Sequence, residues 1–121
     1  MTLYIGGHMR RHPTFDPFNF TRFNVAADAL RRAGYAVISP VDLDHIHGFN
    51  EYHDTVTPEF VCSVLERDKK AMEECDGMAV LPDWEGSGGT AEEVAFAQRV
   101  LDIPVKGVDE WLALALEGKR Q

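Results

Sequence analysis

Two acidic residues, Asp68 and Glu93, are expected among apolar neighbours, where carboxylates are candidates for acid–base or nucleophilic chemistry. In a helix expected at residues 58 to 74, Asp68 falls in the middle of the apolar stripe when residues advance by about 100° each. In the helix that follows the glycine-rich turn, Glu93 projects into the apolar arc, whereas Glu92 projects to the wet side. A carboxylate in such a setting needs a partner or a purpose. The apolar arc around Glu93 comprises Val94, Phe96, Ala97, Val100 and Leu101.

Each carboxylate also has a purely structural explanation. Glu93 stands three residues after Thr90, so its side chain could complete a capping box by reaching back to the Thr90 N–H. Asp68 could bond to backbone groups or pair with a buried arginine. Because two inward carboxylates occur together, we favour a functional role for Asp68, and for Glu93 both interpretations stay open.

The turn before Glu93 has the features of an anion site. The apolar segment 78–81 predicts a buried strand, and Thr90 is typical of a helix N-cap. A strand, a glycine loop and a helix start together present free backbone N–H groups and the positive end of a helix dipole, which hold anions. The turn itself consists of Ser87, Gly88 and Gly89.

A second glycine turn follows the first expected strand, at residues 3–5. Gly6 and Gly7 predict that backbone passes close to another group there. The basic cluster of residues 8–13 comes next, and such clusters are usually solvated. Since ligands of open α/β sheets bind at the carboxyl ends of strands, Arg10 or Arg11 could instead contact an anion.

The order of the elements predicts the fold class. Strands and helices alternate, which indicates an α/β fold with a flavodoxin-like or Rossmann-like parallel sheet of four to five strands and helices on both faces. The loops after the first and third strands then meet at one edge. Beyond the segments already named, we expect helices at residues 19–33 (ended by Gly34) and 108–116, and strands at 35–39, 75–82 and 103–105.

Residues 41–56 form a long polar and aromatic segment that contains His45, His47 and His53. Three histidines suggest zinc, but no cysteine and no HExxH helix accompanies them. We therefore predict a surface loop or lid, and no metal site.

The composition restricts the class of partner. A chain of 121 residues predicts a single domain, 1–121, and its formal charge of −8 disfavours a nucleic-acid polymer and favours a small ligand. No apolar run has transmembrane length, and residues 1–5 lack the basic start and long apolar core of a signal peptide. Cys62 and Cys75 form no CxxC pair, so we expect a cytoplasmic protein with reduced thiols and no membrane partner.

Three stretches resemble the nucleoside 2-deoxyribosyltransferase-like superfamily, and within it most closely the small, often phage-borne DUF4406 group. The resemblance spans nearly the whole chain and implies an enzyme without a cofactor that acts as a homodimer or higher homo-oligomer. The stretches are Tyr4-Ile5-Gly6-Gly7-His8-Met9-Arg10, Arg67-Asp68 ahead of Glu74-Cys75-Asp76, and Trp84-Glu85-Gly86-Ser87 followed by Gly89 and Glu93-Val94-Ala95.

The resemblance also assigns roles to residues. The nucleophile of the superfamily falls on Glu93, and the aspartate that handles the leaving nucleobase falls on Asp68. Six positions before the nucleophile, nucleoside transferases have an aspartate that binds the 5′-hydroxyl, whereas the similar deoxynucleoside 5′-monophosphate N-glycosidases have a phosphate-binding serine. Here that residue is Ser87, and Arg10 matches a phosphate-contacting arginine. The implied substrate site comprises Gly6, Gly7, His8, Arg10, Trp84, Ser87, Gly88 and Gly89.

The resemblance therefore implies hydrolysis of the N-glycosidic bond of a (deoxy)nucleoside 5′-monophosphate. Two alternatives stay open: a deoxyribosyltransferase that exchanges bases between nucleosides, and a nucleotide-binding module without turnover. Trp84 could stack on the base or only anchor its loop. His8 stands where relatives commonly have Pro or Ser, and residues 41–56 have no counterpart in the family, so base recognition is not carried over.

Overall fold

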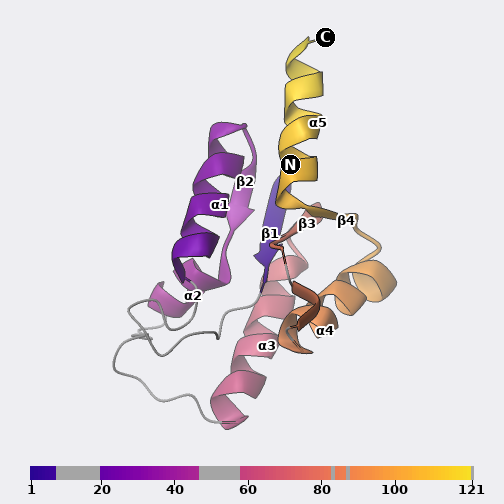
Figure 1. Cartoon of the computed structure of the whole chain (residues 1–121). Coiled ribbons are helices and arrows are strands. Elements are labelled where there is room, and N and C mark those ends of the chain that lie inside the picture. The colour runs from indigo at the N-terminus through magenta and orange to yellow at the C-terminus, as the bar shows by residue number, and fades with distance from the viewer. Residues whose placement is uncertain (8–19, 47–57, 83, 87, 121) are drawn as a thin grey trace.

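The computed structural model describes residues 1–7, 20–46, 58–82, 84–86 and 88–120. Four parallel strands form one sheet in the order β2-β1-β3-β4, with helices on both faces (Figure 1), which confirms the predicted α/β class. The strands are β1 (Thr2–Gly6), β2 (Ala36–Ile38), β3 (Gly77–Val80) and β4 (Val105–Gly107). The helices are α1 (Phe20–Arg32), α2 (Pro40–Ile46), α3 (Pro58–Met72), the short 3-10 helix η1 (Trp84–Gly86), α4 (Gly88–Phe96), the π-helical turn η2 (Ala97–Leu101) and α5 (Val108–Arg120).

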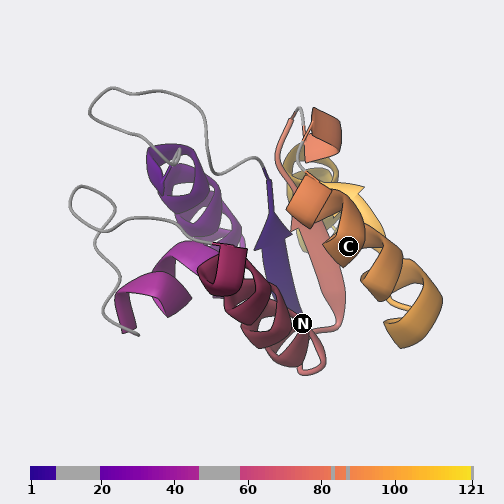
Figure 2. The same ribbon diagram turned by 90° about the horizontal axis from the view of Figure 1, so that it is seen from below.

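Side-chain alternation along the central strands divides the core into two layers. Leu3 and Ile5 of β1 point into one buried cluster, which includes α1 residues and Trp111 of α5. Tyr4, between them, points into the other cluster, which includes residues of α3 and α4. Successive strand residues face opposite sides of a sheet, so a buried parallel strand must be apolar throughout. In Figure 2, α1 and α4 accordingly lie on opposite sides of β1.

The order of strands creates the edge at which ligands of such sheets bind. The chain leaves β1 for β2 on one side and later returns to β3 on the other side of β1. At such a switch point the loops after the two central strands separate and open a crevice at the carboxyl ends of the strands. The loop that begins at Gly7 and the segment between β3 and α4 both start there, as expected from the sequence.

Two expectations for local structure differ from the observed elements. Residues 40–46 form α2 instead of a loop, because the Ser39 hydroxyl accepts the Val41 N–H at 3.3 Å and Pro40 begins the helix. The last strand occupies Val105–Gly107 instead of 103–105. Directly before this strand, the Pro104 carbonyl accepts a hydrogen bond from the Met78 N–H at 2.9 Å. The remainder of the histidine-rich segment, residues 47–56, lies outside the described residues.

The helical phase predicted from the sequence does not hold beyond Ala97. The chain continues as a π-helical turn to Leu101, and Val100, which the phase placed in the apolar arc, is 67% exposed. A π turn contains more residues than an α turn, so residues beyond it are rotated relative to the helix before it. Gly34, in contrast, ends α1 as expected, with a positive φ of 105°.

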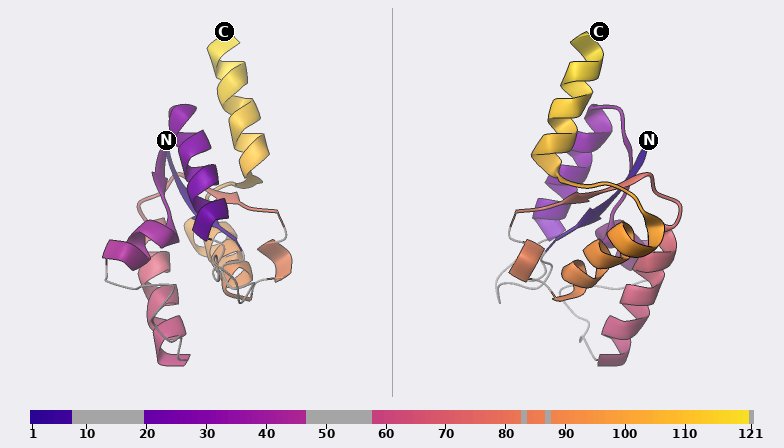
Figure 3. Two further views of the ribbon diagram at one scale, coloured as in Figure 1. Left: turned by 60° about the vertical axis from the view of Figure 1, so that its left-hand side comes forward. Right: turned by 90° about the vertical axis from the view of Figure 1, so that its right-hand side faces the viewer.

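Trp111 anchors α5 to the sheet. Its indole N–H donates to the Met78 carbonyl at 2.9 Å, and a β-carbon at Gly77 would lie only 2.8 Å from its ring. Tyr35 packs edge-on against it, with ring centroids 5.9 Å apart, and donates its hydroxyl to the Trp111 carbonyl at 2.8 Å. Both views of Figure 3 show the remainder of α5 projecting beyond the sheet, so the helix depends on this first turn.

We expect Trp111→Phe to lower the free energy of unfolding by about 1–3 kcal/mol, because a buried hydrogen bond is lost and part of the ring volume is left empty. Urea unfolding measures this change. Leu114→Ala on the same helix is the control: Leu114 is 42% exposed, so its effect should stay within about 0.5 kcal/mol. Equal effects of the two substitutions would contradict the anchoring role of Trp111.

Candidate functional site

Glu93 is fixed by a tyrosine from the first strand. The Tyr4 hydroxyl donates to Glu93 Oε2 at 2.7 Å, and the two residues are 0% and 5% exposed. A buried phenol needs a hydrogen-bond partner, and a carboxylate oxygen is a strong acceptor for it. Glu93 therefore points at the sheet from α4, as its helical phase predicted.

The Glu93 side chain does not form the capping box. A capping box requires Thr90 to lie outside the helix as its N-cap, but α4 already begins at Gly88. Thr90 is therefore in the first turn, and its hydroxyl donates to the Gly7 carbonyl at 2.7 Å. This bond ties the loop after β1 to the start of α4.

Glycine at position 6 leaves the other oxygen of Glu93 uncovered by a side chain from β1. A β-carbon at Gly6 would overlap the Met78 methyl group, lie 3.2 Å from Thr90 Cγ2 and come to 4.0 Å from Glu93 Oε1. The expectation that backbone passes close to another group at Gly6 is thus confirmed. Gly7 is similarly enclosed, because a β-carbon there would lie 2.7 Å from Leu81 Cδ1.

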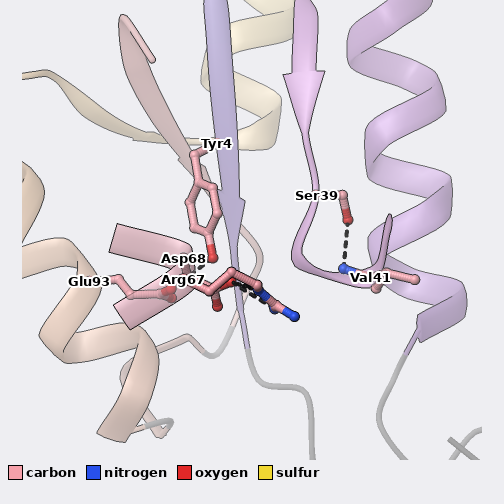
Figure 4. Close-up of polar contacts among 6 residues, drawn as sticks. All are labelled: Tyr4, Ser39, Val41, Arg67, Asp68 and Glu93. Carbon is pink, nitrogen blue, oxygen red and sulfur yellow. Dashed lines mark hydrogen bonds and ion pairs between the residues drawn. The ribbon is translucent and has the colours of Figure 1, made fainter. Parts of the chain in front are cut away.

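Asp68 of α3 meets Glu93 from the adjacent helix. It is 3% exposed, and Figure 4 shows it between the Glu93 carboxyl group and the Arg67 guanidinium. Arg67 donates to Asp68 Oδ1 from both Nε at 3.0 Å and Nη2 at 2.8 Å. The pairing with a buried arginine, foreseen as the structural alternative for Asp68, thus occurs together with the approach to Glu93.

The shared burial of the carboxyl groups controls their protonation. Burial raises the pKa of Glu93 to about 8, with a further rise from the Asp68 charge, while the hydrogen bond from Tyr4 opposes it. Burial also raises the pKa of Asp68, but the charge and hydrogen bonds of Arg67 lower it. The pair therefore keeps a proton near neutral pH, and that proton resides on Glu93 because Arg67 donates two hydrogen bonds to Asp68.

Tyr4 remains a neutral hydrogen-bond donor in this setting. Burial raises its pKa well above the ordinary value, and the charges of Glu93 and Asp68 raise it further. Its hydroxyl therefore stays protonated and donates to Glu93 at neutral pH. Two signals in the sequence could have identified Tyr4: it begins the first stretch that resembles the superfamily, and a phenol in a fully buried strand must find an acceptor.

The remaining predicted site residues have different outcomes. Gly88 and Gly89 open α4. Trp84, in η1, packs against the cluster that contains Tyr4 and lines an open groove of about 710 Å³ between α1 and the start of α5. Neither carboxylate lines this groove, and stacking of Trp84 on a base stays a prediction. His8, Arg10 and Ser87 lie outside the described residues.

The described residues hold no group of three or more histidine, cysteine or acidic side chains arranged for a metal ion. None of the described helices is both long and apolar enough to cross a membrane. On the surface, Lys69 lies 3.6 Å from Glu92, and such exposed pairs contribute about 1 kcal/mol or less.

The burial of Glu93 predicts a pH dependence of stability. Its folded pKa of about 8 lies above the ordinary value of 4.5, so the folded state retains a proton that the unfolded chain has released. This contribution is complete below the ordinary pKa and is lost as the pH rises through the folded pKa. We expect the free energy of unfolding of Glu93→Gln to lack this decline with pH. Relative to wild type, its stability should therefore increase by a few kcal/mol between about pH 5 and pH 9.

Urea unfolding across this pH range measures the difference. Glu92→Gln is the matched control, because Glu92 is exposed on the same helix turn and should leave the wild-type pH dependence unchanged. Parallel stability curves for wild type and Glu93→Gln would show that Glu93 ionises normally in the folded protein.

Comparisons with known proteins agree with this architecture. Residues 1–106 match the family model described as "Domain of unknown function (DUF4406)". The structure of a 2-deoxyribosyltransferase from the psychrotolerant bacterium Bacillus psychrosaccharolyticus is similar, with a TM-score of 0.61 and 21% identity over 87% of this chain and 69% of that one. The search of curated proteins gave no match. The chain therefore belongs to the DUF4406 family and shares the fold of that 2-deoxyribosyltransferase.

Proposed function

We propose that this protein is an N-glycosidase that cleaves the N-glycosidic bond of a (deoxy)nucleoside 5′-monophosphate, with Glu93 as the nucleophile. The observation that carries the proposal is the buried pair of Glu93 and Asp68, aligned by Tyr4 and Arg67 near the carboxyl edge of the sheet. Paired carboxyl groups whose environments differ are the usual means of supplying a nucleophile and a proton donor in one site.

The first step forms a covalent intermediate. A Glu93 carboxylate oxygen attacks C1′ of the sugar through an oxocarbenium-like transition state, the bond from C1′ to the base nitrogen breaks, and its electron pair leaves with the base. The proton of the carboxyl pair passes through Asp68 to the departing base, which leaves Glu93 ionised for the attack. Transfer of a proton within the pair leaves the net charge of the buried site unchanged.

The second step restores the enzyme. Water attacks C1′, the bond to Glu93 breaks, and Glu93 leaves as a carboxylate. The proton released by the water is taken up by the carboxyl pair, so the starting state with one proton is regained. Attack by a second nucleobase instead of water would give the base-exchange reaction, the first alternative.

A 5′-phosphate fits the remaining features of the sequence. Gly88 and Gly89 begin α4, and the backbone N–H groups of a helix start favour an anion. The neutral Ser87 would not repel a phosphate as an aspartate would, and Arg10 supplies a positive charge. The small acidic chain, with a net charge of −8, is consistent with a small nucleotide and not a polymer as substrate.

The enzyme is tested with a panel of nucleosides and nucleoside monophosphates, with release of free base measured by chromatography. We expect Glu93→Gln to abolish release and to leave nucleotide binding largely intact, and Asp68→Asn to slow release by about 10²–10⁴-fold through loss of the proton donor. Glu92→Gln should retain wild-type turnover, because Glu92 is exposed.

The panel also separates the alternatives. Release of base that requires a free acceptor base would identify a transferase. Tight nucleotide binding without any release by the wild-type protein would identify a binding module. Unchanged turnover in Glu93→Gln would eliminate the proposed nucleophile.

Ser87→Asp tests the assignment of phosphate. An aspartate at this position should reduce kcat/KM for monophosphates, because its negative charge repels phosphate. It should maintain or increase kcat/KM for the corresponding nucleosides, because its carboxylate can accept a hydrogen bond from a 5′-hydroxyl. Ser87→Asn, which has nearly the same shape without the charge, is the control. An equal loss for both substrate classes would indicate that residue 87 does not contact the 5′ position.

A further inference from the structure

Arg67 and Asp68 are consecutive residues of α3, yet their side chains converge. Consecutive helical positions diverge by about 100°, so an arginine normally does not face its neighbour. Here the Arg67 side chain, only 18% exposed, bends over Asp68, which is 5% exposed at its side chain. A long charged side chain is held this far from water only when its charge is paired.

The guanidinium of Arg67 contacts a single oxygen of the Asp68 carboxylate. Both donating nitrogens of Arg67 converge on Oδ1 of Asp68, at 3.0 and 2.8 Å. Figure 4 shows the guanidinium and the Glu93 carboxyl group on opposite sides of Asp68. The contact therefore fixes the carboxylate from the side away from Glu93.

The described part of the site contains one cation and two carboxyl groups. Among the described residues, the groups that face Asp68 include Arg67 on its own helix, Glu93 on α4 and Tyr4 on β1. The neighbouring Lys69 is paired with Glu92 near the surface. The guanidinium of Arg67 offsets the charge of one ionised carboxyl group, so ionising the second carboxyl group of the buried pair as well is costly.

We propose that Arg67 is a positioning residue of the carboxyl pair: it holds Asp68 ionised and turned toward Glu93, so that the pair carries a single shared proton. This inference deepens the proposed function, because the glycosidase reaction needs one proton for the leaving base and one ionised carboxylate for the attack. Two protons on the pair would leave no nucleophile, and none would leave no acid.

The proton count can be measured without any substrate. Protein labelled with ¹³C at the side-chain carboxyl groups of aspartate and glutamate is titrated by NMR between about pH 4 and pH 10, and the two resonances are assigned from Asp68→Asn and Glu93→Gln. We expect the wild-type pair to hold one proton at neutral pH. In Arg67→Met and Arg67→Gln, the lower of its two titration steps should rise by about 1–3 pH units, since the opposing cation is lost.

Two further variants separate charge from other effects. Arg67→Lys retains a positive charge and should show a smaller rise. Lys70→Met removes an exposed charge from the same helix and should leave both steps unchanged. A merely structural role of Arg67 would lower stability in urea without moving the titration.

The outcomes distinguish this inference from the proposed function. A wild-type pair holding two protons or none at neutral pH overturns the inference, and this measurement needs no variant to fold. Coincident titrations of wild type and Arg67→Met overturn it as well. If the titrations behave as expected but no nucleotide is cleaved, the proposed function fails while the role of Arg67 stands. With cleavage, the acid limb of the pH dependence of kcat should shift upward in Arg67→Gln together with the NMR titration.

Discussion

The site depends on the burial of two carboxyl groups with one guanidinium. Glu93 and Asp68 are almost fully shielded from water, and Arg67 donates two hydrogen bonds to Asp68. Ionising both carboxyl groups in a buried site has a high free-energy cost, so the pair retains a proton. The position of the guanidinium decides which carboxyl group carries that proton. In the resting structure that member is Glu93, whose pKa is raised to about 8. A nucleophilic role for Glu93 thus requires substrate to draw the proton through Asp68.

The sheet topology provides the frame for this pair. Tyr4 comes from a central strand, and Asp68 and Glu93 come from two helices that cover the same face of the sheet. The Thr90 hydroxyl joins the start of α4 to the loop after β1, which fixes Glu93 relative to Gly6. The catalytic role proposed for the pair needs such support from rigid elements, because small displacements of reacting groups lower a rate by large factors. The similar structure of a 2-deoxyribosyltransferase shows that the overall fold recurs at low sequence identity.

Local patterns in the sequence determined most of the elements, and the failures have physical causes. Alternating strands and helices predicted the parallel sheet, because a chain with this order has few ways to bury every apolar face. The helix α2 was missed although Ser39 and Pro40 repeat the cap-and-proline signal that correctly predicted the start of α3. Val100 was assigned to the wrong face because helical phase assumes uniform turns, and the π turn breaks that assumption.

The sequence by itself determined that Asp68 and Glu93 face inward, because each amphipathic helix buries one side whatever its neighbours are. Only the tertiary structure decided what they meet. Glu93 accepts a hydrogen bond from the hydroxyl of Tyr4, 89 positions away in the sequence. Asp68 accepts hydrogen bonds from the adjacent Arg67, whose side chain would point in another direction in an ideal helix. These contacts depend on which strand lies beside which helix and on how a long side chain folds over its neighbour. Periodicity carries no information on either, since it specifies the direction of a side chain and not its partner.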